Sequence, residues 1–150
     1  VSSVYMDLTY GDIAVDANRS VVFVSGFQTD SLAAVSYAEP SNPVVLDGVV
    51  STSHLNGAWP AVFDDVHNLV ITGNDNGDSV GVVDVANARS MVVLGSTGSA
   101  TTYTNRVLSL CINATNSMAF AAAYDSDSLA IVSYANPSSP SVVNGLVDTT

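Results

Sequence analysis

The chain contains no lysine, only three arginines and a single cysteine, and it has no long apolar run. Against the three arginines stand 14 acidic residues, 13 of which are aspartate, so the formal net charge is −11. Nucleic acids and anionic lipid surfaces are recognised through basic patches, and so little positive charge argues against both as partners. A membrane-spanning helix needs roughly 18 consecutive apolar residues, so no membrane insertion is expected.

The lone cysteine, Cys111, rules out an intramolecular disulfide. It lies in the apolar stretch 108–112, where a lone cysteine usually packs as a small hydrophobe, and we predict a buried thiol. The histidines, His54 and His67, have no Cys, Glu or second His at ligand spacing and are expected to be polar surface residues. No nucleophile motif or glycine-rich phosphate loop is present. The sequence therefore predicts a non-enzymatic protein with no catalytic residue.

What the sequence does contain is a repeat. Residues 30–43 read DSLAAVSYAEPSNP and residues 127–140 read DSLAIVSYANPSSP, identical at 11 of 14 positions at an offset of 97. A degenerate copy, residues 78–91, reads DSVGVVDVANARSM at an offset of 48 and lacks both prolines. A fixed period of 20 to 50 residues is typical of repeat architectures. We infer three copies of one unit of about 48 residues.

Each copy divides into four extended runs separated by turns rich in Asn and Asp. The runs are 13–15, 21–25, 32–36 and 44–50, then 61–63, 69–72, 80–84 and 92–94, then 108–112, 118–122, 129–133 and 142–147. No segment has apolar residues at helical spacing over ten or more residues, so helix content should be close to nil. The runs are almost continuously apolar, as expected when both faces of a sheet are covered. The sequence predicts an all-β, β-propeller-like fold of three four-stranded antiparallel blades; the rival, a parallel β-helix, usually has shorter repeats without hairpin turns.

We treat the chain as one domain, residues 1–150, in four segments. They are the tail of a preceding blade with its connector (1–10), blade 1 (11–58), blade 2 (59–106) and blade 3 (107–150). Propellers usually close with 4 to 8 blades, so three are expected to form a partial propeller or half of a closed ring.

The end copies are as apolar as the middle one. The residues concerned are Val22, Phe23 and Leu32 in the first copy and Phe120, Leu129 and Ile131 in the third. Repeat arrays ordinarily protect their ends with polar caps, which we do not find. We therefore predict uncapped end blades that are covered by self-association or by a protein partner.

The copies resemble the LVIVP repeat, a β-propeller blade family whose pattern runs through a strand ending in VDVSNPxxP. The matching segments are VSYAEPSNP at 35–43, VSYANPSSP at 132–140 and, degenerately, VDVAN at 83–87. The connector LNGAW at 55–59 also resembles the family's lead into the next blade. The resemblance covers nearly the whole chain. It implies a propeller of the kind found mostly on surfaces or secreted, hence extracytoplasmic, and it supplies no catalytic residue.

One loop carries a candidate metal site. Residues 74–78 read NDNGD, and oxygen ligands at alternate positions beside a turn-making glycine suit Ca²⁺, so we name Asn74, Asn76 and Asp78 as candidate calcium ligands. A solvated hairpin turn is the alternative, because the glycine stands at the fourth rather than the sixth place and no bidentate Glu follows. No other cofactor is expected. Asn18 and Asn113 begin N-glycosylation sequons in equivalent turns, which leaves glycosylation open.

Two functions remain. The favoured one is a non-enzymatic structural or protein-interaction module within a larger assembly or a longer propeller. The alternative is a ligand-binding propeller, lectin-like or calcium-dependent, suggested by the Asp and Asn loops and by Trp59, Tyr103 and Tyr124 near the connectors. Packing of these aromatic residues at blade junctions is the other interpretation.

Overall fold

The computed structural model describes residues 11–99 and 101–149; the predicted tail of a preceding blade, residues 1–10, lies outside that part. The first sheet contains β1 (Ile13–Asp16), β2 (Val21–Gly26), β3 (Ser31–Ser36) and β4 (Val44–Val50). The second contains β5 (Ala58–Asp64), β6 (Leu69–Asn74), β7 (Ser79–Asp84) and β8 (Val92–Ser96). The third contains β9 (Val107–Asn113), β10 (Met118–Ala123), β11 (Ser128–Ser133) and β12 (Ser141–Val147).

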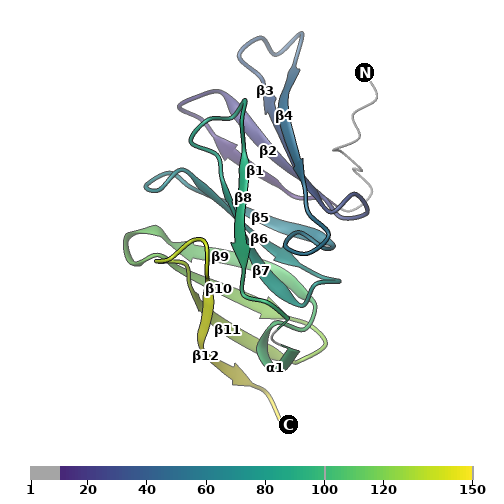
Figure 1. Ribbon diagram of the computed structural model, residues 1–150, viewed down its shortest axis with the longest axis vertical. Helices are drawn as coiled ribbons and strands as arrows, with labels where there is room; N and C mark the ends of the chain where they lie inside the picture. Colours follow the sequence, from purple (N-terminus) through teal and green to yellow (C-terminus); the bar gives the residue numbers. More distant parts are fainter. Residues whose placement is uncertain (1–10, 100, 150) are drawn as a thin grey trace.

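Each sheet is antiparallel, and its strands pair in chain order. The inner strands β1, β5 and β9 lie against one another, and the three sheets fan out from them (Figure 1). The predicted β-propeller-like fold with three four-stranded blades is confirmed. We call the sheets blades 1, 2 and 3.

Helical structure is limited to two short elements in the described residues. They are α1 (Thr101–Thr104), in the connector between blades 2 and 3, and the 3₁₀ turn η2 (Ala114–Asn116). Asn113 caps η2 by accepting a hydrogen bond from the Asn116 amide. None of the described helices is both long and apolar enough to pass through a bilayer.

The turns between second and third strands share one backbone feature. Asp30, Asp78 and Asp127, the residues just before β3, β7 and β11, have φ values of 49°, 48° and 45°. Aspartate and asparagine tolerate this left-handed region better than other non-glycine residues, because their short polar side chains can bond locally. The Asx-rich turns of the sequence therefore have a backbone cause.

Each blade has two faces, which we name by their neighbours. The leading face points toward the following blade, and the trailing face points toward the preceding one. On blade 1, Phe23 lies on the leading face and is fully buried, with its ring centroid 5.5 Å from that of Phe63 on the trailing face of blade 2. A second cluster joins the leading face of blade 2 to the trailing face of blade 3, with Ile71 and Val82 packed near Val132.

The middle blade is buried more completely than the last blade. Every residue of β6 is buried, whereas every residue of the outer strand β12 is exposed or half-buried. The apolar residues of β6 follow one another without alternation for the predicted reason, which is that both faces of this strand are buried.

The apolar residues named in the first copy divide between the two faces of blade 1. Phe23 and Leu32 are fully buried toward blade 2, whereas Val22 lies on the opposite face. The residues of β1 that point away from blade 2 are Ile13 and Val15, which are 57% and 52% exposed. Both faces of this blade are apolar, so sequence alone does not reveal which alternate set points inward.

The predicted burial of Cys111 was also wrong, because its thiol is exposed. Cys111 pairs in register with Phe120, which in turn pairs with Ile131. All three therefore point to the leading face of blade 3, where no further blade of the described chain covers them. Its neighbours along β9, Leu110 and Ile112, point to the opposite face and pack against blade 2.

Candidate functional site

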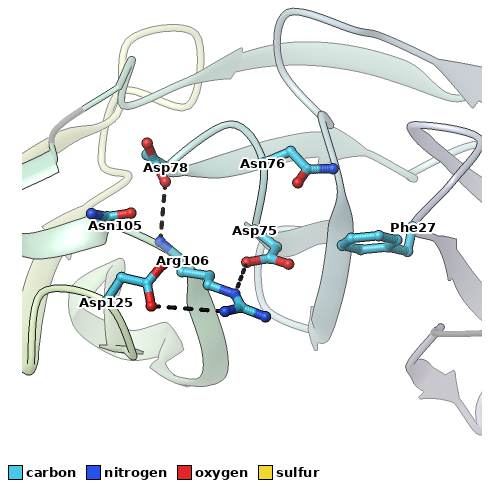
Figure 2. A pocket seen from close by; sticks show the side chains of 7 residues that line it. All are labelled: Phe27, Asp75, Asn76, Asp78, Asn105, Arg106 and Asp125. Carbon is cyan, nitrogen blue, oxygen red and sulfur yellow. Dashed lines mark hydrogen bonds and ion pairs between the residues drawn. The ribbon is translucent and has the colours of Figure 1, made fainter.

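A polar cavity of about 470 Å³ opens at the loops between second and third strands, where blades 1, 2 and 3 meet. Figure 2 shows the residues that line it: Phe27, Asp75, Asn76, Asp78, Asn105, Arg106 and Asp125. Three carboxylates face one guanidinium, so the cavity carries a surplus of negative charge. A neutral or cationic ligand would therefore suit it better than an anion.

Arg106 lies at the centre of the cavity and holds the loops of blades 2 and 3 together. Its Nε donates to Oδ1 of Asp75 at 2.9 Å, and its Nη1 lies 3.7 Å from Oδ1 of Asp125 (Figure 2). The guanidinium carbon also sits 5.4 Å from the ring centroid of Tyr124, in cation–π geometry. Sequence reasoning missed Arg106, whose partners come from two other loops.

The three candidate calcium ligands do not share one environment. Asn76 and Asp78 line the cavity, but Asn74 is fully buried in β6. The Asn74 amide nitrogen donates to the His54 carbonyl at 2.8 Å and to the Ser79 hydroxyl at 3.0 Å, and its oxygen accepts from Thr72. Its side chain is thus committed to the protein interior. Calcium binding by this trio stays a prediction.

Asp78 accepts a hydrogen bond from a backbone amide of the connector to the next blade, and its counterpart in blade 1, Asp30, does the same. Oδ1 of Asp78 accepts a hydrogen bond from the Arg106 amide at 3.1 Å, and Asp30 accepts one from the Gly57 amide at 2.8 Å. Both donors have positive φ, 66° and 69°. The turn aspartate of one blade thus fixes the connector that leads into the next. Residues 11–99 and 101–149 bring together no group of three or more His, Cys, Asp or Glu side chains able to hold a metal ion.

The aromatic residues near the connectors mostly pack at blade junctions. Trp59 contacts Phe27 edge-on, with ring centroids 6.0 Å apart. Tyr103 of α1 covers Gly145 of β12 so closely that an added Cβ would lie 2.3 Å from its Cδ1. Tyr124 is 64% exposed and stacks beneath Arg106. Among these residues, Phe27 is the one that lines the cavity itself.

The second candidate site is the open leading face of blade 3. Leu129 and Leu146 pair in register and are 39% and 71% exposed. Phe120 and Ile131, the next pair on the same face, are half-buried. These four apolar side chains are neighbours on one sheet face. They therefore differ from the singly scattered hydrophobic residues of an ordinary protein surface, which need no explanation. The predicted apolar end at Phe120, Leu129 and Ile131 therefore matches the placement of these residues.

A polar link ties blade 2 to blade 3 at the opposite set of loops. The buried Asp64 carboxylate accepts hydrogen bonds from the Tyr134 hydroxyl and from Nδ1 of His67, both at 2.8 Å. In blade 1 the equivalent Asp16 pairs with Arg19, whose Nη1 reaches the Val85 carbonyl of blade 2 at 2.7 Å. The spacing of three residues between Asp64 and His67 was visible in the sequence, but the distant tyrosine was not.

These contacts lower the pKa values of the Asp64 and Asp16 carboxyls. Burial pushes the pKa of Asp64 upward, but hydrogen bonds from the His67 ring and amide and from Tyr134 outweigh burial and hold the pKa below its ordinary value of 3.8. Burial likewise raises the pKa of Asp16, and the contacts with Arg19 more than reverse it. Burial, and then the bond to Asp64, raise the pKa of Tyr134, so this hydroxyl stays a donor.

Comparison with models of protein families gives no match, and comparison with curated proteins gives none either. Solved structures do match. A functionally unknown protein from Desulfotomaculum acetoxidans superposes with a TM-score of 0.78 at 10% identity, over 95% of this chain and 44% of its own. A candidate 6-phosphogluconolactonase from Bacteroides fragilis gives a TM-score of 0.74 at 10% identity, over 91% of this chain and 38% of its own.

Sqt1 from Saccharomyces cerevisiae gives a TM-score of 0.71 at 12% identity, over 96% of this chain and 38% of its own. The last two structures are β-propeller-type folds. At such low identity the likeness shows the fold alone. The chain spans about two fifths of the length of each of these three structures.

Proposed function

We propose that the chain is a non-enzymatic structural and protein-interaction β-propeller module that works within a larger assembly or a longer propeller. The observation that carries the proposal is the open leading face of blade 3, with Leu129 and Leu146 exposed beside Phe120 and Ile131. An apolar sheet face of this kind marks an interaction site in a soluble protein. The larger size of the matched propeller structures supports the same proposal.

The charged groups of the cavity support a structural role as well. Arg106 is engaged by Asp75 and Asp125, and Asp78 holds a connector amide. Membership of the LVIVP-repeat family and an extracytoplasmic location are part of the same proposal. Asn18 lies in an exposed turn, where a glycan would be accommodated. A glycan on Asn113 would instead stand on the leading face of blade 3.

The proposal predicts that the protein in its native source migrates as a species larger than the 15.4 kDa chain. Replacing Leu129 and Leu146 together by Asp (L129D/L146D) should shift it to a smaller species, because the partner would have to bury two unpaired carboxylates. Size-exclusion chromatography of the extract with immunodetection measures this shift.

A matched control is V66D, which changes a 60% exposed valine in the β5–β6 turn. It should leave the large species intact. Thermal unfolding of both variants checks that the fold survives, since substitutions at exposed positions usually change stability by about 0.5 kcal/mol or less. Wild-type protein found always at the size of the free chain would refute the proposal.

A second candidate is a ligand-binding role for the loop cavity. The observation that favours it is the combination of carboxylate and amide groups with the Phe27 ring around an open volume of about 470 Å³. Carbohydrate hydroxyls or a calcium ion would find acceptors there. A ligand present at 100 times its Kd should stabilise the fold by about 2.7 kcal/mol, and N76A should abolish this gain. Thermal shift with Ca²⁺ and with a panel of monosaccharides tests it; an unchanged melting temperature throughout would remove this candidate.

A further inference from the structure

We propose that the leading face of blade 3 binds the trailing face of blade 1 of a second copy of this chain, head to tail, so that two copies close a six-bladed ring. This inference rests on the proposed function and names the partner. It follows from which face of each end blade has no described blade packed against it.

The open face of blade 3 is the counterpart of a face that is already an interface. In blade 1, the row Ala14, Phe23 and Ala34 is paired across β1, β2 and β3 and packs against blade 2. In blade 3 the row in the same register is Cys111, Phe120 and Ile131, on β9, β10 and β11. The residue types of a leading face are therefore present where no following blade is described.

The outward face of blade 1 is, in the same way, a trailing face. Val15, Val22 and Val35 are paired across β1, β2 and β3 and point away from blade 2. Their counterparts in blade 3 are Ile112, Ala119 and Val132, which are paired across β9, β10 and β11 and pack against blade 2. The leading face of blade 3 and the trailing face of blade 1 thus belong to opposite sides of one blade-to-blade interface and are expected to fit each other. On the trailing face, Ile13 and Val15 of β1 are the exposed residues, whereas Val24 and Ala33 are already buried.

The interfaces within the chain predict individual contacts of the new one. Phe23 stacks against Phe63 between blades 1 and 2, and the corresponding pair is Phe120 of one copy against Val15 of the other. Tyr134 of blade 3 donates to Asp64 of blade 2. The corresponding pair is Tyr37, whose amide bonds to Ser20 just as that of Tyr134 bonds to Ser117, and Asn113.

The polar positions of the leading face suit a contact between two acidic copies. The place of Asp16 and Asp64 is taken in blade 3 by Asn113, and the place of Asp47 is taken by Asn144. The hydrogen-bond partners of these aspartates three residues on, Arg19 and His67, have Asn116 as their counterpart. A joint between two chains of net charge −11 would therefore bury no carboxylate at these positions.

The geometry permits closure. Six blades lie within the range of 4 to 8 for closed propellers, and a head-to-tail contact that closes gives a ring rather than a filament. Four strands about 4.8 Å apart and about 17 Å long present about 300 Å² per face. The four faces of two joints then bury about 1,200 Å², the lower end of specific interfaces.

Sedimentation velocity of the purified chain over a range of concentrations tests the proposal. We expect a discrete species of twice 15.4 kDa that is favoured by higher salt, because salt screens the repulsion between two acidic copies. The leading-face variant L129D/L146D and the trailing-face variant I13D/V15D should each associate at least about 100-fold more weakly. V66D should associate like the wild type.

Mixing the two face variants separates head-to-tail docking from other modes. The trailing-face variant keeps an intact blade 3, and the leading-face variant keeps an intact blade 1, so the mixture should regain a 1:1 dimer through one joint. A dimer that survives I13D/V15D, or a mixture that stays monomeric, would overturn head-to-tail docking. Species growing beyond the dimer would overturn ring closure. Wild-type protein that is monomeric when pure but large in its native source would overturn the second copy as partner and leave the proposed function standing.

Discussion

Replacing Phe23 by alanine is expected to lower the free energy of unfolding by about 3 to 5 kcal/mol, the range for removing a buried phenylalanine ring. Phe23 is fully buried between blades 1 and 2, in a cluster with Ala14, Val70 and Val83. Its ring lies 5.5 Å from Phe63, so the substitution also removes an aromatic contact. Urea denaturation of the monomeric protein measures the loss.

Phe120 provides the matched control, because it occupies the register position of Phe23 in blade 3 but lies on the open face. In dilute, monomeric protein F120A should cost well under half as much as F23A, since its ring is already partly in contact with water. Equal losses for the two substitutions would contradict the placement of Phe120 on an open face.

Replacing Asp64 by alanine is expected to cost about 2 to 4 kcal/mol, because it strips acceptors from several donors at once. The carboxylate accepts from the amides of Val66 and His67 as well as from the His67 ring and Tyr134. Tyr134 is only 2% exposed, and its hydroxyl would be left without its acceptor. Y134F removes the buried hydroxyl itself, so no donor is left without an acceptor at this position. It should cost about 1 kcal/mol. Thermal and urea unfolding measure both.

The acid limb of the stability curve checks the same carboxylate. The pKa of Asp64 is lower in the folded chain than its ordinary value of 3.8. Its contribution is therefore complete above that value and is lost as the pH falls through the folded pKa, below about pH 4. D64A should flatten this loss, whereas D65A, at an exposed neighbour, should leave it unchanged. A D64A protein with wild-type stability at pH 7 would contradict the role assigned to this link.

Much of the fold could be read from the sequence. The strand runs were visible because each is apolar and bounded by Asx-rich turns, and the repeat gave their number and order. Orientation was the part that failed. Successive residues of a strand point to opposite faces of the sheet. In β2, Val22 and Phe23 are neighbours of similar hydrophobicity, so the sequence does not show which of the two points to blade 2. The same ambiguity explains why Cys111, which lies between the inward-pointing Leu110 and Ile112, was wrongly predicted to be buried.

The candidate sites depended on contacts between distant residues. Asn76 and Asp78 were found because they are close together in one loop. Arg106 was missed because its partner Asp75 is 31 residues away, and Tyr134 because it is 70 residues from Asp64. The open face of blade 3, by contrast, was predicted in part, because the repeat identified an uncapped apolar end copy that contains Phe120, Leu129 and Ile131.

The thiol of Cys111 offers the most direct test of the claim that the leading face of blade 3 is a docking surface. It is the single cysteine of the chain and lies on that face beside Phe120. The measurement is the fraction of Cys111 labelled by a maleimide in the native source before and after denaturation. We predict protection before denaturation in the wild type and full labelling in L129D/L146D. Equal and complete labelling of both proteins before denaturation would contradict the account.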